Sequence, residues 1–307
     1  MRTILITGGT GLIGRALCKM LVEKGFKVIV LSRNPSKSKP TDNIHFAHWD
    51  VNSGKIDVNA LTDSDCIIHL AGAGVVEKKW TASYKNEIVE SRTKSSELII
   101  NTLRNNPNHV KTIVSASAIG WYGADIKTDY SFVETDAADH SFLGETCKLW
   151  EDSIEPATNL GIRVCKIRTG IVLSKNGGAL REFIKPIQWG IAAILGKGNQ
   201  IISWIHIEDL CRIFIHCIEN NELHGSYNAV ATSPVSNRTL TITLAKAIKG
   251  IFFIPLFVPS FILRLMMGQR SIEVLKSTRV SCEKIKKTGF VFYYPTIETA
   301  LKNILKK

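Results

Sequence analysis

Residues 4–14 read Ile-Leu-Ile-Thr-Gly-Gly-Thr-Gly-Leu-Ile-Gly, and this stretch decides the fold that we expect. A short apolar strand runs directly into glycines that open a helix, with apolar residues at 13, 17, 20 and 21. In this context the first glycine allows a tight turn, the second lets the backbone approach a pyrophosphate, and the third lets the helix pack close to the sheet. Free N–H groups at the start of the helix then point at the phosphate. The predicted dinucleotide-binding residues are Gly8, Thr10, Gly11, Leu12, Ile13 and Gly14.

The chain that follows alternates short apolar runs with helical segments. The apolar runs are residues 28–31, 44–46, 66–70, 112–115 and 164–167. Helical periodicity covers 86–103 and 145–160, and Pro156 predicts that the second helix kinks or ends early. Continuous apolar strands separated by helices indicate a parallel sheet that is buried on both faces. We therefore expect an α/β fold with a Rossmann-type, doubly wound parallel sheet.

The pattern changes after residue 173. Residues 174–200 are glycine-rich and irregular around a short helix, 201–205 form a strand, and 210–218 have the spacing of an amphipathic helix. From about residue 226 the chain is helical and more apolar, and Thr296 is positioned to cap its last helix. We expect a Rossmann domain at 1–225, with 174–200 contributing to a second lobe. A smaller, mostly helical domain on the substrate side occupies 226–307.

The end of the second strand predicts which nucleotide is bound. Arg33 stands 19 residues after Gly14, where an NAD site has an acidic residue that binds the ribose 2′-hydroxyl. No Asp or Glu occupies 27–41, and a guanidinium suits a 2′-phosphate. We therefore expect NADP(H), contacted by Arg33 and Asn34, with NAD(H) as the alternative. In the other interpretation, Arg33 is a solvated cation on a loop and does not contact the cofactor.

Composition limits which other classes of function the chain can have. The 307 residues carry a formal net charge of +12, which raises the question of a polyanionic partner, but no nucleic-acid-binding motif gathers the basic residues. The seven cysteines are odd in number, lack a Cys-x-x-Cys pair and have no zinc-ligand spacing, so no metal site is expected. These cysteines and an N-terminus without a signal peptide favour a cytoplasmic protein.

One segment is unusually apolar. Residues 250–263 are bounded by Lys249 and Arg264 and interrupted by Pro255 and Pro259. Their 14 residues fall short of the roughly 20 that a membrane-spanning helix needs, so no span is expected. We expect a buried helix and turn of the second domain, and a peripheral membrane contact is the alternative.

The spacing Gly-x-x-Gly-x-x-Gly resembles the extended branch of the short-chain dehydrogenase/reductase superfamily. Motifs at 167–173, 177–180, 203–210 and 228–231 further resemble its atypical, NAD(P)-binding epimerase-like family, whose C-terminal domain is of uncharacterised role. The superfamily has an adenine-contacting Asp after the third strand, which corresponds to Asp50. The cofactor contacts that the resemblance implies are Trp49, Asp50, Leu70, Ala71, Gly72, Ala73 and Ser115.

The acid–base pair of that superfamily is absent. Its chemistry uses Tyr-x-x-x-Lys, in which the lysine lowers the tyrosine pKa. None of the six tyrosines has a lysine four residues on. The tyrosine position falls at Leu143 or Gly144, and the lysine position falls at Cys147 or Lys148.

Several other residues are candidates for catalysis or ligand contact. Ser117 matches the superfamily serine, and Tyr122 on the same loop is a candidate acid, with packing as the alternative for it. Cys147, His140 and His206 are further candidates, with packing on an apolar helix face as the alternative for Cys147 and a structural role as the alternative for His206. Lys78 and Lys79 are candidates for contact with a cofactor or substrate phosphate, with a solvated loop as the alternative. Arg168 at a strand end needs an anionic partner, either the cofactor or a substrate.

Two functions remain open. In the first, the chain is an NADP(H)-binding oxidoreductase or epimerase-like enzyme that acts on a hydroxyl or carbonyl of a small or medium ligand, such as one that resembles a nucleotide sugar. Alternatively, it is a non-catalytic NADP(H)-binding regulator or scaffold. The substrate and the oligomeric state do not follow from the sequence.

Overall fold

One central sheet organises the molecule. The computed structural model describes residues 2–37, 40–41, 43–125 and 130–306. The sheet has the strand order β12-β7-β6-β5-β1-β2-β3-β4, and all neighbours run parallel except β3 and β4. The strands are β1 (Thr3–Thr7), β2 (Lys27–Ser32), β3 (Ile44–Asp50), β4 (Lys55–Ile56), β5 (Cys66–His69), β6 (Thr112–Ala118), β7 (Arg163–Thr169) and β12 (Gly225–Ala229). The predicted doubly wound α/β class is confirmed.

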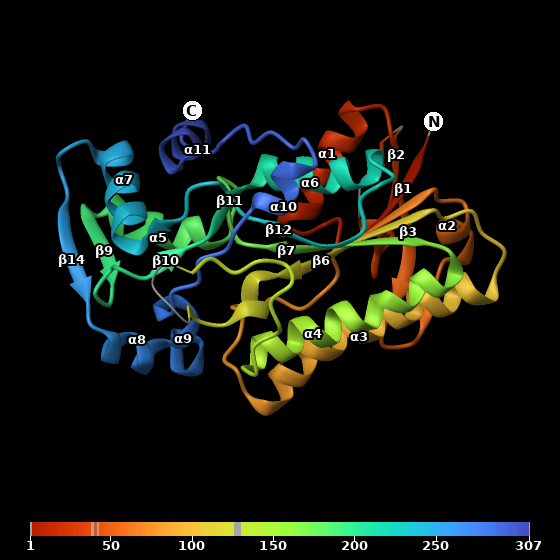
Figure 1. Cartoon of the computed structure of the whole chain (residues 1–307), viewed down its shortest axis with the longest axis horizontal. Helices are drawn as coiled ribbons and strands as arrows, with labels where there is room; N and C mark the ends of the chain where they lie inside the picture. Colours follow the sequence, from red (N-terminus) through yellow and green to blue (C-terminus); the bar gives the residue numbers. More distant parts are fainter. Residues whose placement is uncertain (1, 38–39, 42, 126–129, 307) are drawn as a thin grey trace.

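Helices cover both faces of this sheet. Helices α1 (Leu12–Glu23) and α6 (Ile207–Glu219) lie on one face, and α3 (Ala82–Asn105) and α4 (Phe142–Ile154) lie on the other (Figure 1). The residues of β1 are apolar without alternation because both faces of this strand are buried. Ile4 and Ile6 are buried in the core that contains α1 and α6, whereas Leu5 is buried in the core that contains α3.

The connecting elements are short. They are η1 (Pro35–Lys37), α2 (Val58–Thr62), η2 (Ile119–Tyr122) and η3 (Glu155–Leu160). The predicted early end of the helix before Pro156 is confirmed, because α4 stops at Ile154 and the chain continues as a 3₁₀ turn with the proline in its first positions.

A second lobe adjoins the carboxyl ends of the strands. It contains α5 (Ala179–Gln188), β9 (Ile191–Leu195), α7 (Asn237–Lys249) and α11 (Ile297–Ile304), which share a separate hydrophobic core. Two small sheets lie beside it, β8 (Ile171–Leu173) with β11 (Trp204–His206) and β10 (Ile201–Ile202) with β13 (Val235–Ser236). The strand predicted at 201–205 is therefore two short strands in different sheets. The central sheet is completed by β12, which begins at Gly225 and so lies across the predicted domain boundary.

The apolar segment 250–263 differs from its prediction. Residues Ile254–Val258 form a strand, β14, which pairs in parallel with β9, and α8 (Ser260–Met267) follows it. Pro255 and Pro259 explain why no helix runs through the segment. The expected burial is also wrong, because Phe252 is 78% exposed and Phe261 is 68% exposed.

The chain closes with short elements. These are η4 (Gly268–Arg270), α9 (Ser271–Leu275) and α10 (Glu283–Lys287) before α11, and the prediction that Thr296 caps α11 is confirmed. Within the described residues, no helix combines the length and the apolar character needed to cross a membrane.

Candidate functional site

The glycine turn lies at the topological switch point of the sheet. β1 has β2 on one side and β5 on the other, so the chain reverses direction across the sheet at β1. Ligands of doubly wound folds bind at the carboxyl ends of the strands beside such a point. Gly8 has φ +67°, and a Cβ there would lie 3.0 Å from the Leu70 carbonyl carbon. A Cβ on Gly14 would lie 2.3 Å from the Gly8 oxygen, so only glycine lets α1 pack this close to the turn.

The N-terminus of α1 is left open by this turn. Gly11 is its N-cap, no side chain caps the first amides, and its first turn contains no acidic residue. The first amides of a helix have no partner within the helix, and the helix dipole favours an anion there. Leu12 and Ile13 are half-buried, and Gly11 itself donates its N–H to the Gly8 oxygen at 3.0 Å. These residues fit a dinucleotide pyrophosphate.

A buried histidine holds the neighbouring loop. Thr7 Oγ1 accepts the N–H groups of Leu70 and Ala71 at 3.0 and 3.1 Å, and it lies 2.8 Å from His69 Nδ1. Because the oxygen already accepts twice, its own hydrogen goes to Nδ1. The proton of the neutral ring is then on Nε2, which faces Ser95 Oγ at 3.2 Å. The network fixes the start of the predicted cofactor loop that follows β5.

This histidine makes stability dependent on pH. Burial, with the Arg92 charge second, lowers the pKa of His69 from 6.5 to about 3. The ring is neutral in the folded protein but is protonated in the unfolded chain below pH 6.5, so acid favours unfolding. We expect the free energy of unfolding to fall as pH drops from 6.5 toward 3, and to fall less steeply in His69→Asn.

Chemical denaturation at several pH values measures this slope. The exposed His45→Asn is the matched control and should keep the wild-type slope. Equal slopes in wild type and His69→Asn would contradict the assigned neutral ring.

Arg92 is a residue of this region that sequence reasoning missed. It is buried on α3, its Nη1 donates to the Ala73 oxygen at 3.1 Å, and its guanidinium lies 4.7 Å from the Trp150 ring centre. No carboxylate forms a salt bridge with it in the part of the chain that the structure describes. A cation on a long helix is usually solvated, so the sequence around Arg92 does not indicate that its side chain is buried.

The remaining predicted cofactor contacts follow neighbouring strands at the same edge. Arg33 and Asn34 are exposed directly after β2, and Trp49 and Asp50 end β3. The Asp50 carboxylate accepts the Ser53 hydroxyl at 2.9 Å, which lowers the pKa of Asp50. Its position fits a role at the adenine end, which stays a prediction.

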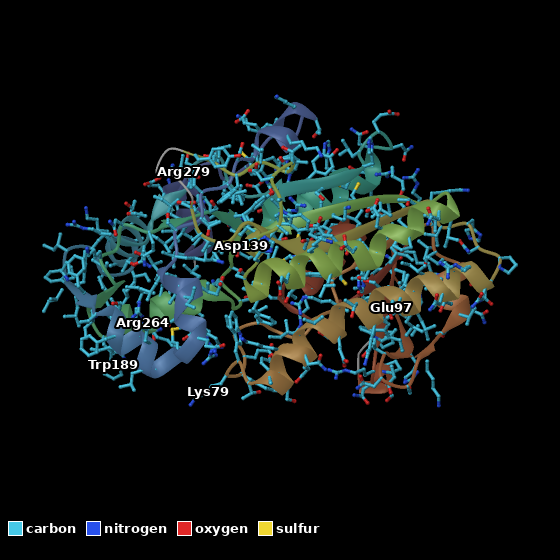
Figure 2. All side chains as sticks on the ribbon, turned by 60° about the horizontal axis from the view of Figure 1, so that its bottom comes forward. Lys79, Glu97, Asp139, Trp189, Arg264 and Arg279 are labelled. Carbon is cyan, nitrogen blue, oxygen red and sulfur yellow. The ribbon has the colours of Figure 1, made fainter. Side chains whose placement is uncertain are left out.

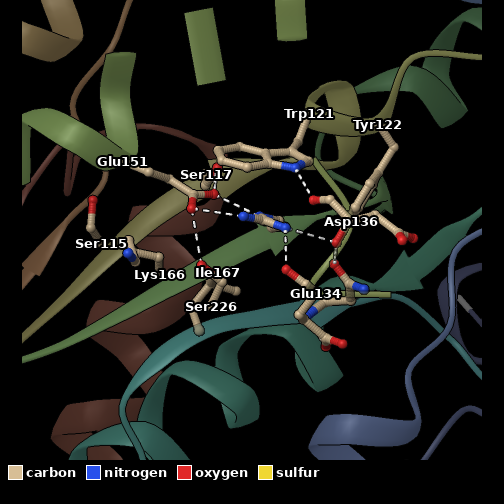
Figure 3. Close-up of polar contacts among 12 residues, drawn as sticks. Ser115, Ser117, Trp121, Tyr122, Glu134, Asp136, Glu151, Lys166, Ile167 and Ser226 are labelled. Atoms are coloured by element: carbon tan, nitrogen blue, oxygen red, sulfur yellow. Dashed lines mark hydrogen bonds and ion pairs between the residues drawn. The ribbon is translucent and has the colours of Figure 1, made fainter. Parts of the chain in front are cut away.

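Ser117 belongs to a buried polar network (Figure 3). Its hydroxyl donates to Glu151 Oε1 at 2.7 Å. Arg168 donates to the same carboxylate from Nε at 2.7 Å and from Nη2 at 3.0 Å, and both charged side chains are almost fully buried. Ser226 donates to Glu151 Oε2 at 3.0 Å. The anionic partner that the sequence requires for Arg168 is therefore a carboxylate of the chain itself. Ser115 lies beside this network, at the last residue pair between β5 and β6.

Tyr122 joins the same network. Its hydroxyl donates to Asn228 Oδ1 at 2.6 Å and accepts from Arg168 Nη1 at 3.0 Å, while its ring stacks on Phe132. Burial raises the pKa of Tyr122 to about 12. The structure thus brings Ser117 and Tyr122 together, but both hydroxyls already have partners within the chain. Their geometry gives them a packing role, and a direct role in catalysis stays a prediction.

The other candidates are dispersed. Cys147 is buried in α4, and burial raises the pKa of its thiol to about 11. His206 Nδ1 accepts the N–H of Glu208 and caps α6, as its structural interpretation predicts. His140, Lys78 and Lys79 are exposed.

A large cavity of about 1180 Å³ lies in the second lobe. Three cationic side chains from separate segments line it, Lys197, Arg264 and Arg279, together with Asp125 from the loop after η2. Arg264 and Arg279 are labelled in Figure 2. No local sequence pattern marks this site, because the three cations are brought together only by the tertiary fold.

Fold and site together define a Rossmann-type α/β protein with a glycine turn at its switch point. The family model described as NAD dependent epimerase/dehydratase family matches residues 4–230, and a Domain of unknown function (DUF1731) matches residues 258–304. The chain belongs to the NAD dependent epimerase/dehydratase family. The family resemblance predicted from the motifs is confirmed.

Similar proteins extend over the whole chain. An epimerase family protein of Staphylococcus saprophyticus is 33% identical over 305 residues, covering 99% of this chain and 100% of the relative. The crystal structure of the human epimerase family protein SDR39U1 with NADPH has a TM-score of 0.85 at 29% identity and covers 98% of both chains. UDP-N-acetylglucosamine 4-epimerase from Bacillus cereus has a TM-score of 0.77 at 16% identity, covering 99% of this chain and 95% of that one, and shares the fold.

Proposed function

We propose that the chain binds NADP(H) at the glycine turn and uses it in an oxidoreductase or epimerase-like reaction. The observation that carries the proposal is the uncapped N-terminus of α1 behind a turn that tolerates only glycine at 8 and 14. The human relative with this fold was crystallised with NADPH, which supports the same choice of cofactor here.

Each end of the dinucleotide has a proposed contact. The amides of Leu12 and Ile13 hold the pyrophosphate, and Arg33 pairs with the 2′-phosphate. The loop of Leu70, Ala71, Gly72 and Ala73, anchored through Thr7 and Arg92, lies along the ribose side. When bound, the cofactor supplies or accepts hydride at a carbon that bears a hydroxyl or carbonyl.

The substrate is proposed to lie between the Rossmann sheet, which includes β12, and the second lobe around α5, β9, α7 and α11. The cationic cavity of the second lobe supports a ligand with an anionic part, as in a nucleotide sugar. The buried, reduced cysteines support the cytoplasm as the proposed compartment.

A non-catalytic regulator or scaffold is the second candidate. The missing Tyr-x-x-x-Lys pair favours it, and so do the engaged hydroxyls of Ser117 and Tyr122. In that case NADP(H) would set a conformation that a partner protein recognises.

Turnover separates the two candidates. We expect hydride transfer from NADPH, or to NADP⁺, with at least one member of a panel of carbonyl compounds and sugar nucleotides. The absorbance of the reduced cofactor measures this transfer. Because the Tyr122 hydroxyl is engaged within the chain, Tyr122→Phe should keep the rate within roughly threefold of wild type, and a larger loss would support the catalytic role predicted from the sequence. Saturable NADPH binding without turnover of any compound would favour the regulator.

A further inference from the structure

One end of the second lobe exposes an unusually apolar surface. Its side chains come from the turn after α5, the loop after α7, the strand β14 and the helix α8. Leu265 is 86% exposed, and Trp189 and Ile251 are each 85% exposed. We call this set the apolar end surface, and its members are Trp189, Ile251, Phe252, Ile254, Leu256, Phe261, Leu265 and Met266. Soluble proteins seldom expose so large an apolar patch unless it meets a partner.

The surface is continuous because its elements are neighbours. The N–H of Ile254 donates to the Gly190 oxygen at 2.8 Å, which places the start of β14 beside Trp189. The strand β14 leads into α8 after one proline, and Figure 1 shows both at the same end of the molecule. Figure 2 labels Trp189 and Arg264 toward the same end of the molecule. The free edge of β14 faces outward, since β9 is its one partner among the described strands.

Basic residues outnumber acidic ones around the surface, although Glu182 pairs with Lys185 on α5 and Glu273 pairs with Lys276 after α9. Residues 183–207 and 237–272 contain no Asp or Glu. They do contain seven basic residues: Lys185, Lys197, Arg238, Lys246, Lys249, Arg264 and Arg270. Of these, Lys246 and Lys249 end α7 directly before the exposed loop, and Arg264 lies within α8. An apolar surface with a basic border attracts an anionic partner.

This charge pattern decides between occupants. A second copy of the chain, docked through the same surface, would bring like charges together, which disfavours that contact. Most of the apolar side chains protrude from a strand edge, a loop and a helix, while Leu265 and Met266 also line a small hollow beside Trp80. Protruding aromatic and aliphatic side chains insert into a bilayer interface, while nearby lysines and arginines meet anionic headgroups.

We propose that the apolar end surface docks the protein peripherally on an anionic phospholipid bilayer. Phe252, Phe261 and Leu265 enter the interface, and Lys246 and Lys249 contact the headgroups. The surface does not include the glycine turn, and it adjoins the loop after β5, where Arg270 Nη1 donates to the Val76 oxygen at 2.7 Å.

Vesicle co-sedimentation of the full chain tests the proposal. We expect binding to phosphatidylcholine vesicles that contain about one third phosphatidylglycerol, and much weaker binding to phosphatidylcholine alone. Raising the salt from about 0.1 M to about 1 M should weaken the binding, because screening shortens the reach of the charges. The double variant Phe252→Ser/Leu265→Ser, and separately Lys246→Glu/Lys249→Glu, should each reduce binding by roughly tenfold.

A matched control and a local readout keep the test specific. Val291 is 68% exposed outside the surface, so Val291→Ser should bind like wild type. Brominated lipid should quench wild-type tryptophan fluorescence, and Trp189→Phe should lose most of that quenching. No binding to either vesicle overturns the proposal, and so does equal loss in Val291→Ser. Self-association that Leu265→Ser abolishes, without vesicle binding, would assign the surface to a second copy and also overturn it.

Discussion

Replacing Arg168 by methionine is expected to lower the free energy of unfolding by about 3–5 kcal/mol, because removing one partner of a buried ion pair leaves the other charge uncompensated. Glu151 is 4% exposed and would keep only the hydroxyls of Ser117 and Ser226. The Arg168 guanidinium also lies 3.6 Å from the Trp121 ring centre, so the packing of η2 is lost as well. Denaturant unfolding followed by circular dichroism measures the change.

Two control variants test whether the loss of stability comes from the uncompensated charge. Arg168→Met combined with Glu151→Leu should recover a large part of the loss, since both charges are then gone. Lys148→Met removes an exposed ion pair with Asp152 on the same helix and should cost less than about 1 kcal/mol. If Arg168→Met costs no more than Lys148→Met, the buried network does not support the fold as we describe.

Arg33→Ala is expected to weaken NADPH binding by roughly 10- to 100-fold, the size of a lost hydrogen bond to a charged group. NADH lacks the 2′-phosphate, so its affinity should change little. Arg33→Asp should go further and favour NADH, because a carboxylate accepts the ribose 2′-hydroxyl and repels a phosphate. Fluorescence titration with both nucleotides measures the ratio of affinities. An unchanged ratio in both variants would remove Arg33 from the site.

The parts of the fold that local sequence dictates could be predicted. The glycine turn requires glycine for reasons confined to a few residues, since Gly14 meets the backbone of Gly8. The early end of α4 follows from Pro156 alone. The parallel sheet follows from apolar strands that are buried on both faces, as Ile4 and Leu5 show from opposite sides of β1.

Features that depend on tertiary contacts could not be predicted. Arg168 clearly needed an anion, but Glu151 stands 17 residues earlier on a helix that looked merely amphipathic. The strand β12 lacks a long apolar run, because its Ser226 and Asn228 hydrogen-bond to Glu151 and Tyr122 of the same network. The segment at 250–263 has the composition of a core, and only its position at the outer edge of β9 shows that it is exposed.

Titration of the wild-type chain with NADPH and with NADH tests the central claim most directly. The uncapped N-terminus of α1 and the exposed Arg33 predict saturable binding of NADPH with a lower Kd than that of NADH. Absence of saturable binding for both nucleotides, or tighter binding of NADH, would contradict the assignment of the glycine turn as an NADP(H) site.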